Sequence, residues 1–178
     1  MNLKSGDARL AIHEGDPIFL AGFMGAGKTA AGRALASLLG YSFLDLDALI
    51  EERAGKSISE IFTQLGEQEF RRLETEAIRS LGELKLAVVA LGGGAYQSEP
   101  NRAALRATGV TVWLDCTFEV CFERIKGGTS RPLLAGESEL RELFDSRRAA
   151  YSAADYVVET GSLPPEKVAA QIIAKLTA

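Results

Sequence analysis

Histidine and cysteine are scarce in this chain of 178 residues, which has one His and two Cys. The single imidazole, His13, lies near the N-terminus, so histidine-based zinc sites and acid–base catalysis have almost no residues to use. Cys116 and Cys121 lie five positions apart and make an incomplete metal site and a poor disulfide pair. We therefore expect two small, partly buried thiols in a reducing compartment, and a cytoplasmic protein.

Long apolar runs and clusters of one charge are also missing. No apolar stretch approaches the ~18–20 residues that span a membrane, and residues 1–15 lack the apolar core of a secretion signal. The net charge is −4 and no run of Lys and Arg reaches five residues. We therefore expect neither a nucleic acid nor a membrane as partner. The hydrophobic content of 47% fits one globular domain with a full core.

The clearest motif that is present is Gly-Phe-Met-Gly-Ala-Gly-Lys-Thr at 22–29, a complete phosphate-binding loop. It follows an apolar run and precedes an amphipathic segment, which is the strand–loop–helix context that the motif requires. Its glycines let backbone N–H groups point at the β-phosphate, and the next helix adds the positive end of its dipole. The motif predicts nucleoside triphosphate binding, with Lys28 at the β- and γ-phosphates and the Thr29 hydroxyl on Mg²⁺.

Short apolar segments alternate with helical patterns along the chain. We expect strands at 18–21, 42–46, 86–91, 110–114 and 156–159, and helices at 28–39, 48–54, 58–65, 67–81, 99–108, 118–126, 139–152 and 165–176. This alternation predicts one three-layer α/β domain over 17–178 with right-handed crossovers. Residues 1–16 are expected to form a loosely ordered, flexible leader.

Two segments interrupt the alternation of strands and helices. Residues 47–85 contain several predicted helices, and residues 127–138 are rich in glycine and contain Arg131-Pro132. Long insertions in a compact domain are usually functional. A phosphotransferase needs one segment that binds the acceptor and a lid that excludes water, and we assign 47–85 and 127–138 to these roles.

Two carboxylates, Asp45 and Asp47, end the second predicted strand. Strand alternation would point both the same way, beyond the carboxyl end of the sheet and beside the phosphate loop. One could hold a Mg²⁺-bound water while the other orients or deprotonates an acceptor hydroxyl, and the alternative is that either caps the next helix. Asp115 imitates a metal-binding acid after the fourth strand, but we favour a helix cap ahead of Phe118 for it.

Two features of the chain could contact an acceptor. Arg71 and Glu74 lie three apart, so on a helix they can pair and present a fork to a carboxylate or phosphate. A routine surface pair is an equal alternative for them. The glycines at 92–94 indicate that another group closely approaches the backbone there, or else a plain flexible turn.

Three further arginines could bind anions. Arg131 lies inside the predicted lid, where it could stabilise charge on a transferring phosphoryl group. Arg147 and Arg148 lie on one predicted helix, one turn before Tyr151. We expect one of these two arginines to complete an anion site and the other to be solvated.

Together these motifs resemble the shikimate kinase family from about Pro17 to the C-terminus. The shared signatures are 22–29, 43–47 with 50–51, 55–61, 66–74, 91–95, 131–134, and Arg147 four residues before Tyr151. The resemblance implies phosphorylation of the 3-hydroxyl of shikimate by ATP with Mg²⁺, in aromatic amino-acid biosynthesis. It also implies a nucleoside-monophosphate-kinase-like P-loop kinase fold, with a five-stranded parallel sheet of order 2-3-1-4-5. We expect a monomer.

The resemblance also implies a role for each candidate residue. Asp47 would bind the substrate hydroxyls and be the candidate base, Arg71 and Arg147 would hold the carboxylate, and Glu74 would orient Arg71. Backbone N–H groups at Gly92, Gly93 and Gly94 would face the substrate. The phosphates would be bound by Gly25, Ala26, Gly27, Lys28, Thr29 and Ala30, with Arg131 from the lid. Thr29 would bind Mg²⁺, with Asp45 reaching it through water, and residues 160–168 would flank the adenine.

Some residues depart from the family pattern, and two other functions compete. Ala149 stands where the family often has proline, and Leu163 stands where some members have a basic residue near the adenine. The first alternative is a related small-molecule kinase such as gluconate kinase, which would not need paired arginines here. The second is a non-catalytic kinase-like regulator, which would be expected to have lost Lys28, Asp47 or Arg131.

Overall fold

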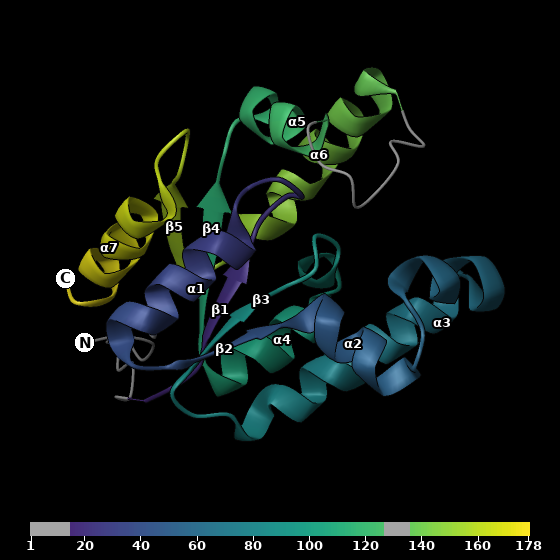
Figure 1. Cartoon of the computed structure of the whole chain (residues 1–178), viewed down its shortest axis with the longest axis horizontal. Helices are drawn as coiled ribbons and strands as arrows, with labels where there is room; N and C mark the ends of the chain where they lie inside the picture. The colour runs from purple at the N-terminus through teal and green to yellow at the C-terminus, as the bar shows by residue number, and fades with distance from the viewer. Residues whose placement is uncertain (1–14, 127–135) are drawn as a thin grey trace, which may run out of the picture.

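The computed structural model describes residues 15–126 and 136–178 (Figure 1). Most of the predicted leader therefore lies outside the described residues, and so do Arg131 and residues 127–135 of the predicted lid. Gly15 and Asp16 are described. The Gly15 carbonyl accepts a hydrogen bond from Leu86 N at 2.7 Å, and Asp16 forms an ion pair with Lys85.

A five-stranded parallel sheet forms the middle layer, and its strand order is β2-β3-β1-β4-β5. The strands are β1 (Ile18–Ala21), β2 (Ser42–Asp45), β3 (Ala87–Ala90), β4 (Val110–Asp115) and β5 (Tyr156–Glu159). Strand β1 is central, with Ile18 paired to Val88 of β3 and to Val110 of β4. Its residues are buried because helices cover both faces, which confirms the predicted fold class and strand order.

Seven α-helices are described around this sheet. They are α1 (Lys28–Leu39), α2 (Leu46–Ala54), α3 (Ile58–Ser80), α4 (Glu99–Thr108), α5 (Phe118–Lys126), α6 (Glu137–Tyr151) and α7 (Pro165–Leu176), with 3₁₀ turns at Leu81–Glu83 and Ala95–Gln97. Helices α1 and α7 pack together on one face, and α4 with part of α3 covers the other (Figure 1). Helices α5 and α6 extend beyond the end of β4, and α2 with α3 extends to the side.

Most predicted element boundaries agree with the structure, and the exceptions concern the site. Strand β2 ends at Asp45 and α2 begins at Leu46, so Asp47 is helical and the predicted alternation of two strand carboxylates is wrong. The two helices predicted across 58–81 form one element with a kink at Gly66, where φ is 83° and ψ is 167°. Glycine tolerates this positive φ, so at the predicted break the helix changes direction and does not end.

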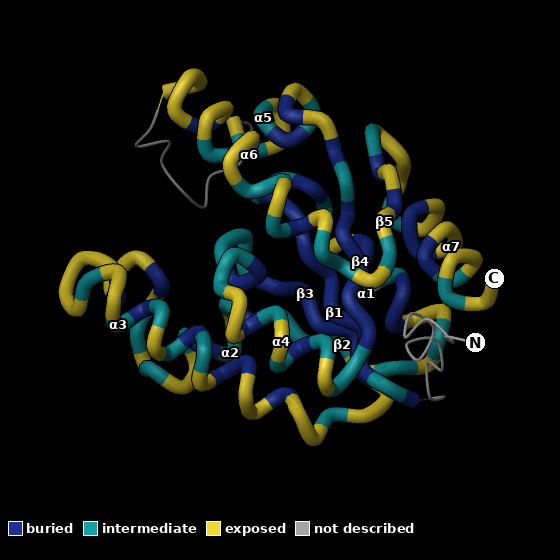
Figure 2. The backbone as a smooth tube through the Cα atoms, turned by 180° about the vertical axis from the view of Figure 1, so that it is seen from behind, coloured by how far each residue is buried: buried dark blue, intermediate teal, exposed yellow. Residues whose placement is uncertain are grey.

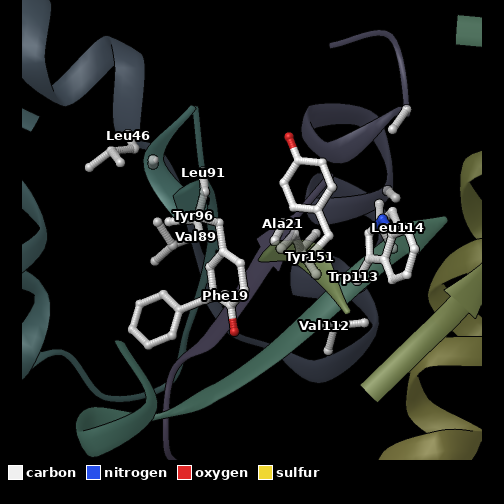
Figure 3. Packing of buried hydrophobic residues seen from close by; sticks show 14 of the residues in the cluster. Phe19, Ala21, Leu46, Val89, Leu91, Tyr96, Val112, Trp113, Leu114 and Tyr151 are labelled. Carbon is white, nitrogen blue, oxygen red and sulfur yellow. The ribbon is translucent and has the colours of Figure 1, made fainter. Parts of the chain in front are cut away.

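The core lies between the sheet and its helices (Figure 2). Strands β1, β3 and β4 and the helices that cover them all contribute aliphatic side chains, and Trp113 of β4 packs with Tyr151 of α6 with ring centroids 6.0 Å apart (Figure 3). Both cysteines are buried rather than partly buried. Within 15–126 and 136–178, no helix has the length and apolar character needed to cross a membrane.

Candidate functional site

The phosphate loop between β1 and α1 has the backbone that its motif predicts. Gly25 and Gly27 have φ of 79° and 93°, in the left-handed region. A Cβ at Gly25 would also lie 2.6 Å from the carbonyl oxygen of Cys121, so only glycine fits there. Lys28 begins α1 and its Nζ donates to the carbonyls of Gly22 at 2.8 Å and Phe23 at 3.0 Å. These bonds hold the ammonium group against the loop.

Burial lowers the pKa of Lys28 to about 8, although the nearby carboxylates of Asp47 and Asp45 oppose the shift. Burial removes water from the ammonium group, and the nearby carboxylates offset this cost only in part. An added anion would therefore stabilise the charged form strongly. The loop therefore presents Lys28 where a phosphate group would satisfy it.

Asp45 contacts both the phosphate loop and helix α2. Its Oδ1 accepts from Asp47 N at 3.1 Å and so caps α2, which is the alternative left open by the sequence. Its Oδ2 accepts from the Thr29 hydroxyl at 3.0 Å. A hydroxyl and a carboxylate are the hard oxygen donors that Mg²⁺ prefers, and they lie together beside the phosphate loop, so the residues present fit this ion.

Asp47 lies in the first turn of α2 and faces the glycine turn that follows β3. A Cβ at Gly92 would lie 2.6 Å from Oδ1 of Asp47. The carboxylate also interacts electrostatically with Lys28, which places it between the phosphate loop and the glycine turn. Asp47 therefore reaches the site from a helix and not from the end of a strand.

Arg71 and Glu74 form an ion pair with one partly exposed partner and one buried partner. Nη1 of Arg71 lies 3.0 Å from Oε2 of Glu74, whose side chain is 2% exposed, against 37% for Arg71. Arg71 also bonds Glu67 at 3.2 Å. Burial raises the pKa of Glu74 against the opposing effect of Arg71, and Glu74 Oε1 is buried with no hydrogen-bond partner. The buried carboxylate fixes the direction of the exposed guanidinium.

Each of the three consecutive glycines contacts a different predicted substrate residue. A Cβ on Gly94 would lie 2.6 Å from Nη1 of Arg71, and one on Gly93 would lie 3.3 Å from Nη1 of Arg147. With Gly92 against Asp47, a side chain at any of the three positions would push against the end of a side chain that lines the site. None of the three glycines has a positive φ, so the constraint here is space and not backbone conformation. The predicted close approach to the backbone is present.

These side chains surround one cavity of about 120 Å³. Its lining consists of Met24, Asp47, Ile58, Phe62, Phe70, Arg71, Glu74, Gly92, Gly93, Gly94 and Arg147. Phe62 and Phe70 come from the two sides of the Gly66 kink, and their ring centroids lie 4.6 Å apart. The lining thus combines two guanidinium groups, two carboxylates and two phenyl rings. The sequence analysis assigned neither phenylalanine to the cavity, although Phe70 lies within the signature at 66–74.

Helix α6 contributes Arg147 to the cavity and directs Arg148 elsewhere. Arg147 lies over the ring of Phe23, 5.7 Å from its centroid. Arg148 donates to both carboxylate oxygens of Asp115, at 2.8 and 3.0 Å. Two expectations are therefore wrong: Arg148 is not simply solvated, and Asp115 does not cap α5. The hydroxyl of Thr117 accepts from a backbone N–H of α5 instead.

The structure adds Arg124, which the sequence analysis missed. Its Nη1 donates to the Gly25 carbonyl at 3.0 Å and its Nη2 to the Gly161 carbonyl at 3.1 Å. Arg124 thus joins the phosphate loop to the segment predicted to flank the adenine. No local sequence motif predicts this role of Arg124, because both of its partners are backbone carbonyls far away along the chain. Of the other predicted site residues, Ala26 lies in the phosphate loop and Ala30 in the first turn of α1, and Arg131 lies outside the described residues.

Comparisons with known proteins agree on one family. A family model described as shikimate kinase matches residues 24–177. A shikimate kinase from Geobacter sulfurreducens is 49% identical over 162 residues, which cover 89% of this chain and 90% of that protein. The structure of shikimate kinase from Acinetobacter baumannii in complex with shikimate has a TM-score of 0.86 at 39% identity, over 91% of this chain and 93% of that one.

A gluconokinase from Sinorhizobium meliloti 1021 is more distant. Its structure has a TM-score of 0.61 at 19% identity, over 91% of each chain. At that identity the likeness shows a shared fold and nothing more about the acceptor.

Proposed function

This chain belongs to the shikimate kinase family, and we propose from this premise that it transfers the γ-phosphoryl group of ATP to the 3-hydroxyl of shikimate. The products are shikimate 3-phosphate and ADP. The observation that carries the proposal is the glycine turn, which brings Asp47, Arg71 and Arg147 against one cavity beside the phosphate loop.

The groups around the cavity match the chemistry of the acceptor. Shikimate offers one carboxylate and three hydroxyls on a small ring. Arg71 and Arg147 are two permanent cations for the carboxylate, and backbone N–H groups of the glycine turn and Asp47 are available to the hydroxyls. Phe62 and Phe70 give the apolar part of the ring a surface to pack against.

The phosphate side of the site supplies positive charge and orientation. Lys28 and the backbone N–H groups of residues 25–30 bind the phosphates, and Arg131 acts from the lid. Thr29 and Asp45 would hold Mg²⁺, Thr29 directly and Asp45 through water. When bound, Mg²⁺ neutralises negative charge on the phosphate oxygens.

Asp47 orients the acceptor hydroxyl and accepts its proton as the oxygen bonds to the γ-phosphorus. Asp47 lies near enough to Lys28 to interact with it electrostatically, and a carboxylate is a good hydrogen-bond acceptor and a weak base. In a loose phosphoryl-transfer transition state little proton transfer is needed early, so orientation is its larger contribution.

The remaining assignments concern the nucleotide base and the state of the protein. Arg124 and residues 160–168 form the edge of the site where the adenine would lie, with Leu163 exposed beside them. We also propose a monomer in the cytoplasm with no nucleic-acid or membrane partner, which fits the net charge of −4.

A coupled assay of ADP release tests the proposed reaction. Mg²⁺-ATP is supplied with shikimate, gluconate or a nucleoside monophosphate in parallel. Release that depends on shikimate alone is expected. Release with gluconate and not with shikimate would contradict the assignment of the two arginines. Bound ATP without release on any acceptor would favour a regulatory protein.

A further inference from the structure

Just after Arg147, helix α6 is attached at two points, one to the end of strand β4 and one to the glycine turn that follows β3. Arg148 forms its two hydrogen bonds with Asp115, the last residue of β4. Three residues later, the Tyr151 hydroxyl donates to the Gly93 carbonyl at 2.5 Å. Of these partners, Gly93 lines the cavity together with Arg147, while Asp115 ends the neighbouring strand β4.

The Arg148–Asp115 contact differs from an ordinary surface ion pair. The guanidinium uses two N–H groups on two carboxylate oxygens, which fixes its plane as well as its distance. It also lies over the ring of Trp113, 4.9 Å from the centroid, and 5.7 Å from the centroid of Phe144. The side chains of Arg148 and Asp115 are 42% and 21% exposed, so the pair is partly shielded from water, mainly on the carboxylate side.

Geometry links this contact to the substrate cavity. Adjacent residues of an α-helix point about 100° apart around its axis, so fixing the rotation of the helix at Arg148 fixes the direction in which the Arg147 side chain leaves it. The Nη1 of Arg147 lies against Gly93 and near the ring of Phe23, and the guanidinium interacts electrostatically with Glu74 and Tyr151. Whether Arg147 points into the cavity therefore depends on the rotation of α6.

We propose that Arg148 is a positioning residue: its bidentate pair with Asp115 sets the rotation of α6 and so directs Arg147 at the acceptor carboxylate. The carboxylate as ligand rests on the proposed function. The positioning itself rests on the contacts of α6 with β4. Asp115, which imitates a metal-binding acid in the sequence, serves here as the anchor on the sheet.

The test compares Arg148→Ala, Arg148→Lys and Asp115→Ala with Glu142→Ala, an exposed residue of the same helix, as control. Arg148→Ala and Asp115→Ala are expected to raise the KM for shikimate about fivefold to tenfold, with the KM for ATP within about twofold of the parent. Arg148→Lys keeps the charge without the fork and should fall between. The double alanine variant should be no worse than either single one, because both remove one interaction.

An unchanged KM for shikimate in Arg148→Ala would overturn the proposal, and so would an equal rise in both KM values, which indicates general loosening. A second measurement does not depend on catalysis. The side-chain Nε–H NMR signal of Arg147 in the ligand-free protein should shift or broaden in Arg148→Ala and Asp115→Ala, and not in Glu142→Ala. If the parent protein does not turn over shikimate, the proposed function fails, and this signal still decides the positioning. An Arg147 signal identical in all variants overturns it.

Discussion

A Cβ on Gly94 would lie 2.6 Å from Nη1 of Arg71, so the turn after β3 and the arginine of α3 are in direct contact. The two residues belong to different parts of the chain, and only the absence of a side chain lets them meet. The same turn accommodates Asp47 at Gly92 and Arg147 at Gly93. The shape of the acceptor cavity therefore depends on three missing side chains as much as on the charged ones.

Replacing Gly94 with alanine tests this packing. The new methyl group must displace the Arg71 guanidinium, so we expect the KM for shikimate to rise about tenfold while the KM for ATP stays near the parent value. Gly82→Ala is a matched control, because a Cβ there meets only a side-chain methyl of Thr108 at 3.4 Å. Equal kinetics for Gly94→Ala and the parent would show that Arg71 does not need its present position.

Replacing Arg71 with alanine should weaken shikimate binding and leave nucleotide affinity unchanged. The adjacent Arg72 offers a close control, since it pairs with Glu69 and Glu76 at the exposed surface and does not line the cavity. We expect a large rise in the KM for shikimate only in Arg71→Ala. A comparable rise in Arg72→Ala would indicate general damage to α3, and no rise in either would mean that the carboxylate is held elsewhere.

Asp47→Asn should keep ATP binding and lower kcat at least ~10²-fold, because the amide cannot accept the hydroxyl proton and orients it poorly. The change preserves the shape of the side chain, so the cavity should persist. Nucleotide affinity from a direct titration is the control, and kcat comes from the ADP-release assay. Turnover near that of the parent would remove Asp47 from catalysis.

The binding of ADP should weaken as the pH rises through about 8. Burial lowers the pKa of Lys28 to about 8 in the free protein, so the ammonium loses its proton above that pH. A phosphate ligand prefers the charged form, and the affinity is therefore highest below the pKa and falls above it. Calorimetric titration from about pH 7 to about pH 9.5 measures this, with shikimate as the control ligand. An ADP affinity that is constant over this range contradicts the assignment.

The sequence predicted the elements that carry strong local patterns. The phosphate loop and α1 follow from glycines at fixed spacing and from helical periodicity, and they are present as expected, whereas the two helices predicted on either side of Gly66 form one kinked element. The start of α2 was misjudged because a strand ending in Asp-Leu-Asp has no local sign of where pairing stops. The Asp45 side chain caps α2, so the strand ends at Asp45 and Asp47 belongs to the helix.

Contacts between distant parts of the chain were the least predictable. Arg148 and Asp115 are 33 residues apart, and nothing in either neighbourhood indicates that they pair. Arg124 bonds two carbonyl groups, and any residue supplies a carbonyl, so no composition reveals it. The glycine turn was more informative, because three adjacent glycines imply that other groups must come close, although not which ones.

The most direct test of the proposed reaction is ³¹P NMR of the product formed from shikimate and Mg²⁺-ATP, with the phosphorus correlated to ring protons. The account predicts ADP and one new phosphate ester in equal amounts, with the ester phosphorus coupled to the proton at position 3 of the ring. An ester coupled to a different ring proton, or ADP formed with inorganic phosphate and no ester, would contradict it.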